Sequence, residues 1–219
     1  APSASTPWYA GPSLIEHLET VELANTRAQE RSFRMPVQWV NRPNLDFRGF
    51  CGTIASGIVR PGEEIMVLPS RQTTKVKSIV TFDGEQEEAF TPLSVTLTFE
   101  DEIDASRGDM IVHRENLPAV RARFDATVVW MIDEALVPGR EYIFKHTTRQ
   151  VTGTVGTIRH RIDVNTFDHL AAKELGLNEV GFCNVSLSEE IAFDPYETNR
   201  DTGAFVLIDR LTNATVGAG

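Results

Sequence analysis

Residues 94–112 of the chain read SVTLTFEDEIDASRGDMIV. Within 94–99, apolar and small polar residues alternate, and a period of two is that of a β-strand with one buried face. The acidic run 100–104 and the triplet Arg107-Gly108-Asp109 then separate this strand from a second apolar segment at 110–112. Glycine between polar residues is typical of a tight turn. The segment therefore predicts a strand, a loop, a turn and a returning strand.

The same pattern of short apolar strands separated by turns extends from residue 33 to the end of the chain. Short runs rich in β-branched residues are separated by turn signals, which recur at Pro61-Gly62, Asp83-Gly84, Pro138-Gly139 and Thr202-Gly203. Regular short strands with such turns predict a barrel or a sandwich. A break near 116–118 divides the strands into two groups. We therefore predict an all-β fold with two consecutive β-barrels, at 30–117 and 118–219.

The first 29 residues differ from the rest and predict a short α-helix followed by a linker. Ser13 and Glu16 have the spacing of a capping box, in which each side chain satisfies a backbone N–H at the helix start. Apolar residues follow at spacings of four and three, so a helix over 13–23 has one apolar face. Residues 24–32 are polar and resemble a linker. A second, brief helix is expected at 168–175, ended by Gly176.

Composition and charge argue against a nucleic-acid partner. The 219 residues contain 21 Lys and Arg against 31 Asp and Glu, for a net charge of −10. The two barrel regions are equally acidic, since residues 29–117 and 118–219 each hold 10 basic and 14 acidic groups. Nucleic-acid binders usually carry a basic surface, because phosphate neutralisation dominates their affinity. We expect no nucleic-acid partner.

Targeting signals and cysteine usage predict a cytoplasmic protein without membrane contact. No apolar run approaches the length of a membrane helix, and the start of the chain lacks a cationic segment followed by an apolar one. Cys51 and Cys183 are far apart in sequence and form no CxxC motif, so a disulfide scaffold is not expected. Cys183 lies in an alternating apolar run and is predicted to be a buried structural thiol.

The residues reveal no catalytic or metal-binding constellation. Gly52 and Gly57 have the spacing of a phosphate loop, but the Lys and hydroxyl residue that should follow are absent. Barrel packing or a strand bend explains them better. None of the five histidines is spaced for metal binding. The acidic run 100–104 is interpreted as a solvated loop anchored by Ile103, although paired carboxylates also suit acid–base work or a hard cation.

A polar loop over 41–49 is the strongest candidate for a contact site. Loops on a rigid barrel are where binding residues gather. We predict that this loop touches a partner or a neighbouring domain, and the alternative is a hairpin loop with internal hydrogen bonds. The candidate residues are Asn41, Arg42, Asp46, Phe47 and Arg48.

Several longer stretches resemble a known family. Residues 33–70, FRMPVQWVNRPNLDFRGFCGTIASGIVRPGEEIMVLPS, resemble the second domain of translational GTPases of the elongation factor Tu kind. IVTFDGEQEEAF (79–90) and the acidic segment 100–112 are more specific. They are similar to the GTPase large subunit of bacterial sulfate adenylyltransferase, which also occurs in nodulation proteins and fused to adenylylsulfate kinase. Residues 128–155 and 199–219 resemble the third domain of that subunit.

The resemblance implies a coupling role for this part of the subunit. Residues 7–23 are similar to the last helix of the family's GTPase domain, but its phosphate loop, D-x-x-G and N-K-x-D motifs are absent from the 219 residues. No cofactor is therefore expected on these residues. GTP and Mg²⁺ would bind the GTPase domain, and ATP and sulfate would bind the small catalytic subunit. There they become adenylylsulfate and pyrophosphate, a step of sulfate assimilation and cysteine biosynthesis.

The expected partners are accordingly that small catalytic subunit and the chain's own GTPase domain. In the form of the subunit that is fused to adenylylsulfate kinase, the kinase domain would begin soon after residue 219, and the sequence does not tell whether this chain is of that form. An alternative is the barrel region of a specialised elongation factor that binds aminoacyl-tRNA or the ribosome. The even negative charge of both barrel regions disfavours it. A third reading is an independent enzyme with a site assembled across the two barrels.

Overall fold

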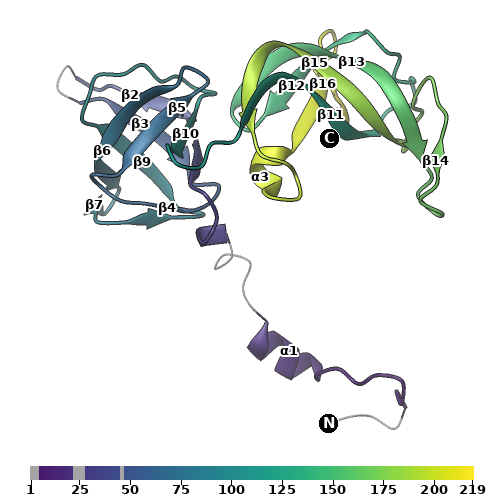
Figure 1. Ribbon diagram of the computed structural model, residues 1–219, viewed down its shortest axis with the longest axis horizontal. Helices are drawn as coiled ribbons and strands as arrows, with labels where there is room; N and C mark the ends of the chain where they lie inside the picture. The colour runs from purple at the N-terminus through teal and green to yellow at the C-terminus, as the bar shows by residue number, and fades with distance from the viewer. Residues whose placement is uncertain (1–4, 22–27, 45–46) are drawn as a thin grey trace.

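The computed structural model describes residues 5–21, 28–44 and 47–219, and its strands form two barrels joined by a short segment (Figure 1). The first barrel region contains β1 (Arg34–Pro36), β2 (Trp39–Asn41), β3 (Gly49–Thr53), β4 (Ile58–Val59), β5 (Glu64–Leu68), β6 (Gln72–Thr81), β7 (Gly84–Gln86), β8 (Ala89–Phe90), β9 (Ser94–Phe99) and β10 (Met110–His113). The second contains β11 (Ala119–Trp130), β12 (Glu141–His146), β13 (Arg149–Ile162), β14 (His169–Leu170), β15 (Val180–Phe193), β16 (Phe205–Asp209) and β17 (Thr215–Ala218). The expected all-β class is confirmed.

The first barrel closes where the chain passes from β1 to β2. Its strands follow the order β1-β10-β5-β6-β9-β3-β2, with β7 beside β6. Because β1 and β2 are consecutive in the chain but stand at opposite ends of this order, the polypeptide between them joins the ends. Across this seam Arg34 of β1 pairs with the segment after β3: the Arg34 N–H donates to the Ser56 carbonyl at 2.9 Å, and the Ala55 N–H donates to the Arg34 carbonyl at 2.8 Å. Alternate strand residues fill the interior, among them Phe33, Met35, Phe50, Ile54, Ile65, Ile79, Leu97 and Ile111.

The second barrel is a ring of six strands. The order β12-β16-β17-β11-β15-β13 returns to its start because β12 also pairs with β13, and β14 extends the sheet beside β13. Trp130 and Tyr142 meet edge to face in its core, with ring centres 5.7 Å apart. The Trp130 indole N–H donates to the Glu134 carbonyl at 2.6 Å, so the buried polar atom is satisfied.

Two glycines of the first barrel are required by close backbone approach. A β-carbon at Gly52 would lie 2.4 Å from the Pro36 carbonyl oxygen. Gly57 has φ of +79°, and a β-carbon there would lie 2.5 Å from the Phe33 α-carbon. Both values are below any normal contact, and a positive φ favours glycine. The interpretation of these glycines as packing positions is confirmed.

The predicted N-terminal helix is present as α1 (Leu14–Thr20). The capping box is complete: Ser13 Oγ accepts from the Glu16 N–H, and a Glu16 carboxylate oxygen accepts from the Ser13 N–H at 2.7 Å. The apolar face points to solvent, since Leu14 is 73% and Leu18 65% exposed. In Figure 1, α1 lies away from both barrels. No helix among the described residues is long and apolar enough to cross a membrane.

Two local predictions were wrong. The helix expected at 168–175 does not form, because His169 and Leu170 pair with β13 as β14 and Leu175 is buried in a bridge with Leu136. Residues 170–174 (LAAKE) are good helix formers, but strand pairing and burial outweigh this local propensity. The turn expected at Thr202-Gly203 is the end of a short helix, α3 (Arg200–Gly203). Asn199 caps α3 by accepting from the Asp201 N–H at 3.1 Å.

Candidate functional site

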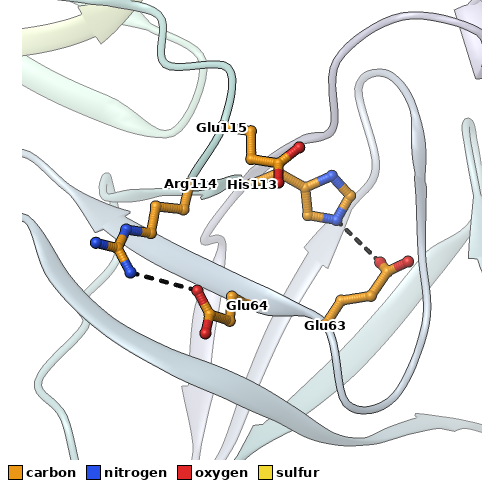
Figure 2. A pocket seen from close by; sticks show the side chains of 5 residues that line it. All are labelled: Glu63, Glu64, His113, Arg114 and Glu115. Carbon is orange, nitrogen blue, oxygen red and sulfur yellow. Dashed lines mark hydrogen bonds and ion pairs between the residues drawn. The ribbon is translucent and has the colours of Figure 1, made fainter.

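A polar hollow opens on the first barrel beside the segment that leads to the second (Figure 2). Glu63 and Glu64 line it from the start of β5, and His113, Arg114 and Glu115 line it from the end of β10. His113 Nε2 lies 3.0 Å from a Glu63 oxygen, and Arg114 Nη1 lies 3.4 Å from a Glu64 oxygen.

The His113–Glu63 pair has the composition of an acid–base pair, but its setting is that of a surface pair. Both side chains are about one third exposed, at 29% and 33%. The His113 ring leans on the Phe33 ring, with centres 5.0 Å apart, which fixes its orientation. Within the described part of the chain, no group of three or more potential ligands is arranged to hold a metal ion. The hollow therefore brings two charge pairs, His113–Glu63 and Arg114–Glu64, together on the surface of the first barrel.

The candidate loop 41–49 lies between β2 and β3. Asn41 ends β2, Arg42 is exposed, and Asp46 lies outside the described residues. Phe47 N–H donates to the Asn44 side chain at 2.9 Å. Arg48 binds Asp104 at 3.0 Å and stacks over Phe50, so these contacts lie within the first barrel. Contact between this loop and a partner stays a prediction.

The acidic run 100–104 is held as a loop on the outside of the first barrel. Asp101 accepts a hydrogen bond from Thr74 Oγ1 at 2.9 Å, and the Asp104 N–H donates to Gln72 at 3.1 Å. Ile103 packs against the barrel core, as expected for its anchor. Each described contact ties the run to its own barrel, which favours the interpretation as a solvated loop.

The most elaborate polar site of the molecule lies where the two barrels meet. Arg34, only 3% exposed, donates from Nε and Nη2 to the two carboxylate oxygens of Asp194 at 2.9 and 3.0 Å. Its Nη1 donates to the Phe33 and Asn116 carbonyls, both at 2.9 Å. The guanidinium is therefore bound by both barrels and by the connecting segment. A bidentate pair of this kind fixes direction as well as distance.

The segment 194–204 of the second barrel completes this junction. Thr202 Oγ1 donates to the Asp194 carboxylate at 2.7 Å, so the charged pair is satisfied on both sides. Asn199 Nδ2 donates to Ser56 Oγ at 3.0 Å, and Ser56 in turn donates to the Ser32 carbonyl at 2.6 Å. A buried network in which each member has partners rigidifies the groups it joins.

A second polar contact and an apolar cluster extend the junction. Arg149 of the second barrel lies 3.3 Å from Asp109 of the first and also binds Glu189 of its own barrel. The turn at Gly108 lies directly against Arg149. Desolvation raises the pKa of the Asp109 carboxyl, and its bonds to the Ser106 N–H and to Arg149 oppose this. The apolar cluster contains Met66, Leu68, Met110, Val112, Val120 and Ala192.

His146 is the buried titratable group behind this junction. It is 3% exposed, and its Nε2 lies 2.8 Å from the Thr202 carbonyl oxygen. Desolvation lowers the pKa of His146, while the bond to Thr202 and the charge of Asp194 partly oppose this shift. A lowered pKa makes the ring neutral near pH 7, so Nε2 carries the hydrogen that bonds the carbonyl. His146 therefore supports the segment that carries Asp194.

The two thiols differ in exposure. Cys183 is fully buried in the core of the second barrel, and desolvation raises its pKa to about 11. A thiol with such a pKa is a weak nucleophile at neutral pH. The prediction of a buried structural thiol is confirmed. Cys51 is half-buried on the outer face of the first barrel, with Sγ 3.2 Å from Thr96 Oγ1.

The junction was not found from the sequence. Arg34 and Asp194 are separated by 160 positions, and no local spacing links them. One signal was present: Arg34 stands between Phe33 and Met35 in an apolar strand. A charged residue in such a place is rarely buried without a partner.

Known proteins share the fold and part of the sequence of this chain. Residues 123–219 match a family described as GTP-eEF1A C-terminal domain-like. A crystal structure of sup35 complexed with GDP superposes with a TM-score of 0.80 over 97% of this chain and 52% of that chain. The sequences are 21% identical, so this likeness concerns the fold. It supports the elongation-factor-Tu-like barrel fold that the sequence predicted.

Curated relatives are much more similar in sequence. The bifunctional enzyme CysN/CysC of Rhodopirellula baltica is 58% identical over 99% of this chain and 33% of its own length. Sulfate adenylyltransferase subunit 1 of Alteromonas mediterranea is 52% identical over 99% of this chain and 46% of its own. The bifunctional enzyme NodQ of Rhizobium sp. is 52% identical, with 33% of its length covered. The chain thus spans between a third and a half of these relatives. It belongs to the family of sulfate adenylyltransferase subunit 1 and the CysN/CysC and NodQ bifunctional enzymes.

Proposed function

We propose that these two barrels form the docking and coupling region of a sulfate adenylyltransferase GTPase subunit and carry no catalytic residue themselves. The relatives named as subunit 1 of this enzyme provide the first support, because a subunit 1 implies a second subunit to bind. The observation that carries the proposal is the buried Arg34–Asp194 pair. A junction fixed in direction and distance lets a displacement of one barrel move the other as one body.

The coupling follows from this rigidity. GTP and Mg²⁺ would bind a GTPase domain outside the 219 residues, and ATP and sulfate would bind a small catalytic subunit. Hydrolysis would shift the GTPase domain against the barrels, and the barrels would pass that shift to the bound subunit. Arg34 and Asp194 act by holding the relative position of the barrels during this step.

Direct docking is tested by mixing the 219-residue chain with the small catalytic subunit of a close relative in the analytical ultracentrifuge. A complex that sediments faster than either component at tens of micromolar is the expected result. Sedimentation of two independent species would count against docking through the barrels. The family assignment would stand, because it rests on sequence identity.

The predicted contact loop can be tested in the same assay. Arg42 is exposed on this loop, so we expect the charge reversal Arg42→Glu to weaken the complex. Lys77→Glu is the matched control, because Lys77 is also exposed on the first barrel but lies on β6. Equal loss of binding in both variants would indicate a general charge effect and would remove the loop from the proposal.

Binding of aminoacyl-tRNA would instead indicate a specialised elongation factor. Both barrel regions carry more acidic than basic groups, 14 against 10 in each. We therefore expect no salt-sensitive retention of aminoacyl-tRNA in a filter-binding titration. Tight binding that weakens steeply with added salt would overturn the coupling proposal.

A further inference from the structure

The long strands of the second barrel run between the junction and the opposite end of the barrel. β11 leaves the junction at Ala119 and ends at Trp130, and its antiparallel neighbours β15 and β17 start at that end and return. The same alternation brings together the connections at residues 131–140, 163–179 and 210–214, on the side away from the first barrel. In Figure 1, β14 within the second of these connections marks this side of the molecule. We call these three connections the distal end.

The distal end carries nearly all the exposed large apolar side chains of the second barrel. Within residues 118–219 seven such side chains are exposed, and only Tyr196 lies on the junction side. The other six are Met131, Val137, Val164, Phe167, Leu177 and Leu211. Single exposed apolar residues are ordinary on a protein surface, but a group of them at one place marks an interaction site.

Two of these side chains are held in place by aspartates. Phe167 is 75% exposed, on a turn in which the Asn165 N–H donates to the Asp163 carboxylate at 2.8 Å and the Phe167 N–H donates to the Asp163 carbonyl at 2.8 Å. Its φ of +62° is unfavourable for a bulky residue and is maintained by these bonds. Leu211 is 88% exposed, and its N–H donates to the Asp209 carboxylate at 3.0 Å. Apolar side chains on a fixed backbone lose little freedom on binding, which favours a tight contact.

The charges of the distal end leave an excess of carboxylates. Its arginines are paired with carboxylates of the same end, in Arg140–Glu134, Arg140–Asp209, Arg161–Glu179 and Arg210–Glu141. Four more carboxylates, each close in sequence to one of the apolar side chains, form no ion pair with any described residue: Asp133, Asp163, Asp168 and Glu174. Lys173 is the only Lys or Arg of the three connections that is likewise unpaired within the described part of the chain. The rim around the apolar side chains is therefore negative.

We propose that the distal end is the surface that receives the small catalytic subunit, through a patch on that subunit with an apolar centre and a basic rim. The inference rests on the docking role proposed above and adds its place and its chemistry. The apolar side chains set the centre of the contact, because such groups contribute most when they are removed from water. The unpaired carboxylates set the sign of the rim, because complementary charge steers and selects a partner.

The position of the distal end suits a partner that is to be moved. The exposure of its apolar side chains shows that no described residue covers them, and α1 lies away from both barrels in Figure 1. The junction holds the opposite end of the second barrel through the Arg34–Asp194 pair. When a rigid body rotates, the end farthest from its attachment moves most. A small rotation passed through the junction would therefore be largest where we place the small subunit.

Serine substitutions at the two fixed apolar side chains test the surface. Sedimentation velocity over a concentration series measures the Kd of the natural chain and of each variant for the small catalytic subunit of a close relative. We expect Phe167→Ser and Leu211→Ser each to raise the Kd by about tenfold or more. Phe82→Ser is the matched control and should keep the natural Kd, because Phe82 is a fully exposed apolar residue in the β6–β7 turn of the first barrel. Equal thermal midpoints confirm that the variants are folded.

The sign of the rim is tested at a single position. Leu211→Lys and Leu211→Glu remove the same apolar side chain and add opposite charges. We expect the lysine variant to bind about threefold or more weakly than the glutamate variant, with a difference that shrinks as salt is added. Equal Kd values at low salt, or weaker binding by the glutamate variant, would overturn the basic rim of the partner.

The other outcomes separate this inference from the docking role on which it rests. Natural affinity in both serine variants would overturn the distal end as the docking surface, while docking through loop 41–49 would stand. An equal loss in Phe82→Ser would overturn it too, because the effect would not be specific to this end. The absence of any complex with the natural chain would refute the docking role and the inference together. A dimer of the natural chain alone that Phe167→Ser disrupts would assign the surface to a second copy instead.

Discussion

At the scale of single residues, Arg34 connects the two halves of the molecule. Its guanidinium contacts Asp194 of the second barrel and the Asn116 carbonyl of the connecting segment. Removing a charge from water is unfavourable, and this pair regains the loss only because both partners are fully hydrogen-bonded. A change at either partner therefore leaves an uncompensated buried charge, which is more harmful than the loss of one contact.

The substitution Asp194→Asn tests this point with little change of shape. We expect it to lower the free energy of unfolding of the second barrel by about 3 kcal/mol, because Arg34 stays buried without its counter-charge. Urea denaturation followed by the fluorescence of the buried Trp130 measures it. Glu64→Gln is the matched control, since the Glu64–Arg114 pair is more than half exposed and should contribute less than about 1 kcal/mol. Equal effects of the two substitutions would argue against the junction.

His146 should give the molecule a distinct dependence on pH. Burial lowers the pKa of His146 in the folded protein below its usual value of 6.5, so the unfolded chain takes up a proton first as the pH falls. The contribution of His146 to stability is therefore complete above about pH 6.5 and is lost as the pH falls through the folded pKa. We expect His146→Gln to lose less stability than the natural chain between pH 7 and pH 5 in thermal denaturation. Parallel curves for the two proteins would contradict this.

At the scale of elements, the sequence predicted what depends on local pattern. The period of two in 94–99 matches β9, and the capping box at Ser13 and Glu16 marks the start of α1. The segment 168–175 was misread because its fate depends on pairing with β13 and on the bridge to Leu136. The candidate contact loop was located from its composition, but the junction joins positions 160 apart and had no local pattern.

Tight backbone approach at Gly57 should make this turn intolerant of any side chain. Its φ is +79°, and a β-carbon would meet the Phe33 backbone at 2.5 Å. We expect Gly57→Ala to destabilise the first barrel by more than about 3 kcal/mol, from strain and overlap together. Gly62 separates the two effects, because its φ is +86° but nothing lies within 4 Å of the added carbon. Gly62→Ala should lower the free energy of unfolding by about 1 kcal/mol in the same denaturation experiment.

At the scale of the whole molecule, the two barrels share a junction built from different kinds of contact. Two ion pairs cross the junction, Arg34–Asp194 and Arg149–Asp109. In addition, apolar side chains of both barrels pack together in one buried cluster. Domains of one chain commonly move against each other unless their interface is large and apolar. Here the buried Arg34–Asp194 pair fixes the relative orientation of the two barrels, which the apolar cluster alone would not do. A fixed orientation suits two barrels that transmit a displacement.

Cooperative unfolding is the whole-molecule consequence of this junction. The barrels cannot separate without breaking the bidentate Arg34–Asp194 hydrogen bonds and exposing the apolar cluster to water. We therefore expect one calorimetric transition whose enthalpy equals the van't Hoff value. In Asp194→Asn the link is weakened, so the barrels should melt in two transitions, while Glu64→Gln should keep a single one. Two separate transitions in the natural chain would show that the barrels fold independently. A displacement could then not pass from one barrel to the other through this junction, and the coupling role would have to rest on contacts with a partner instead.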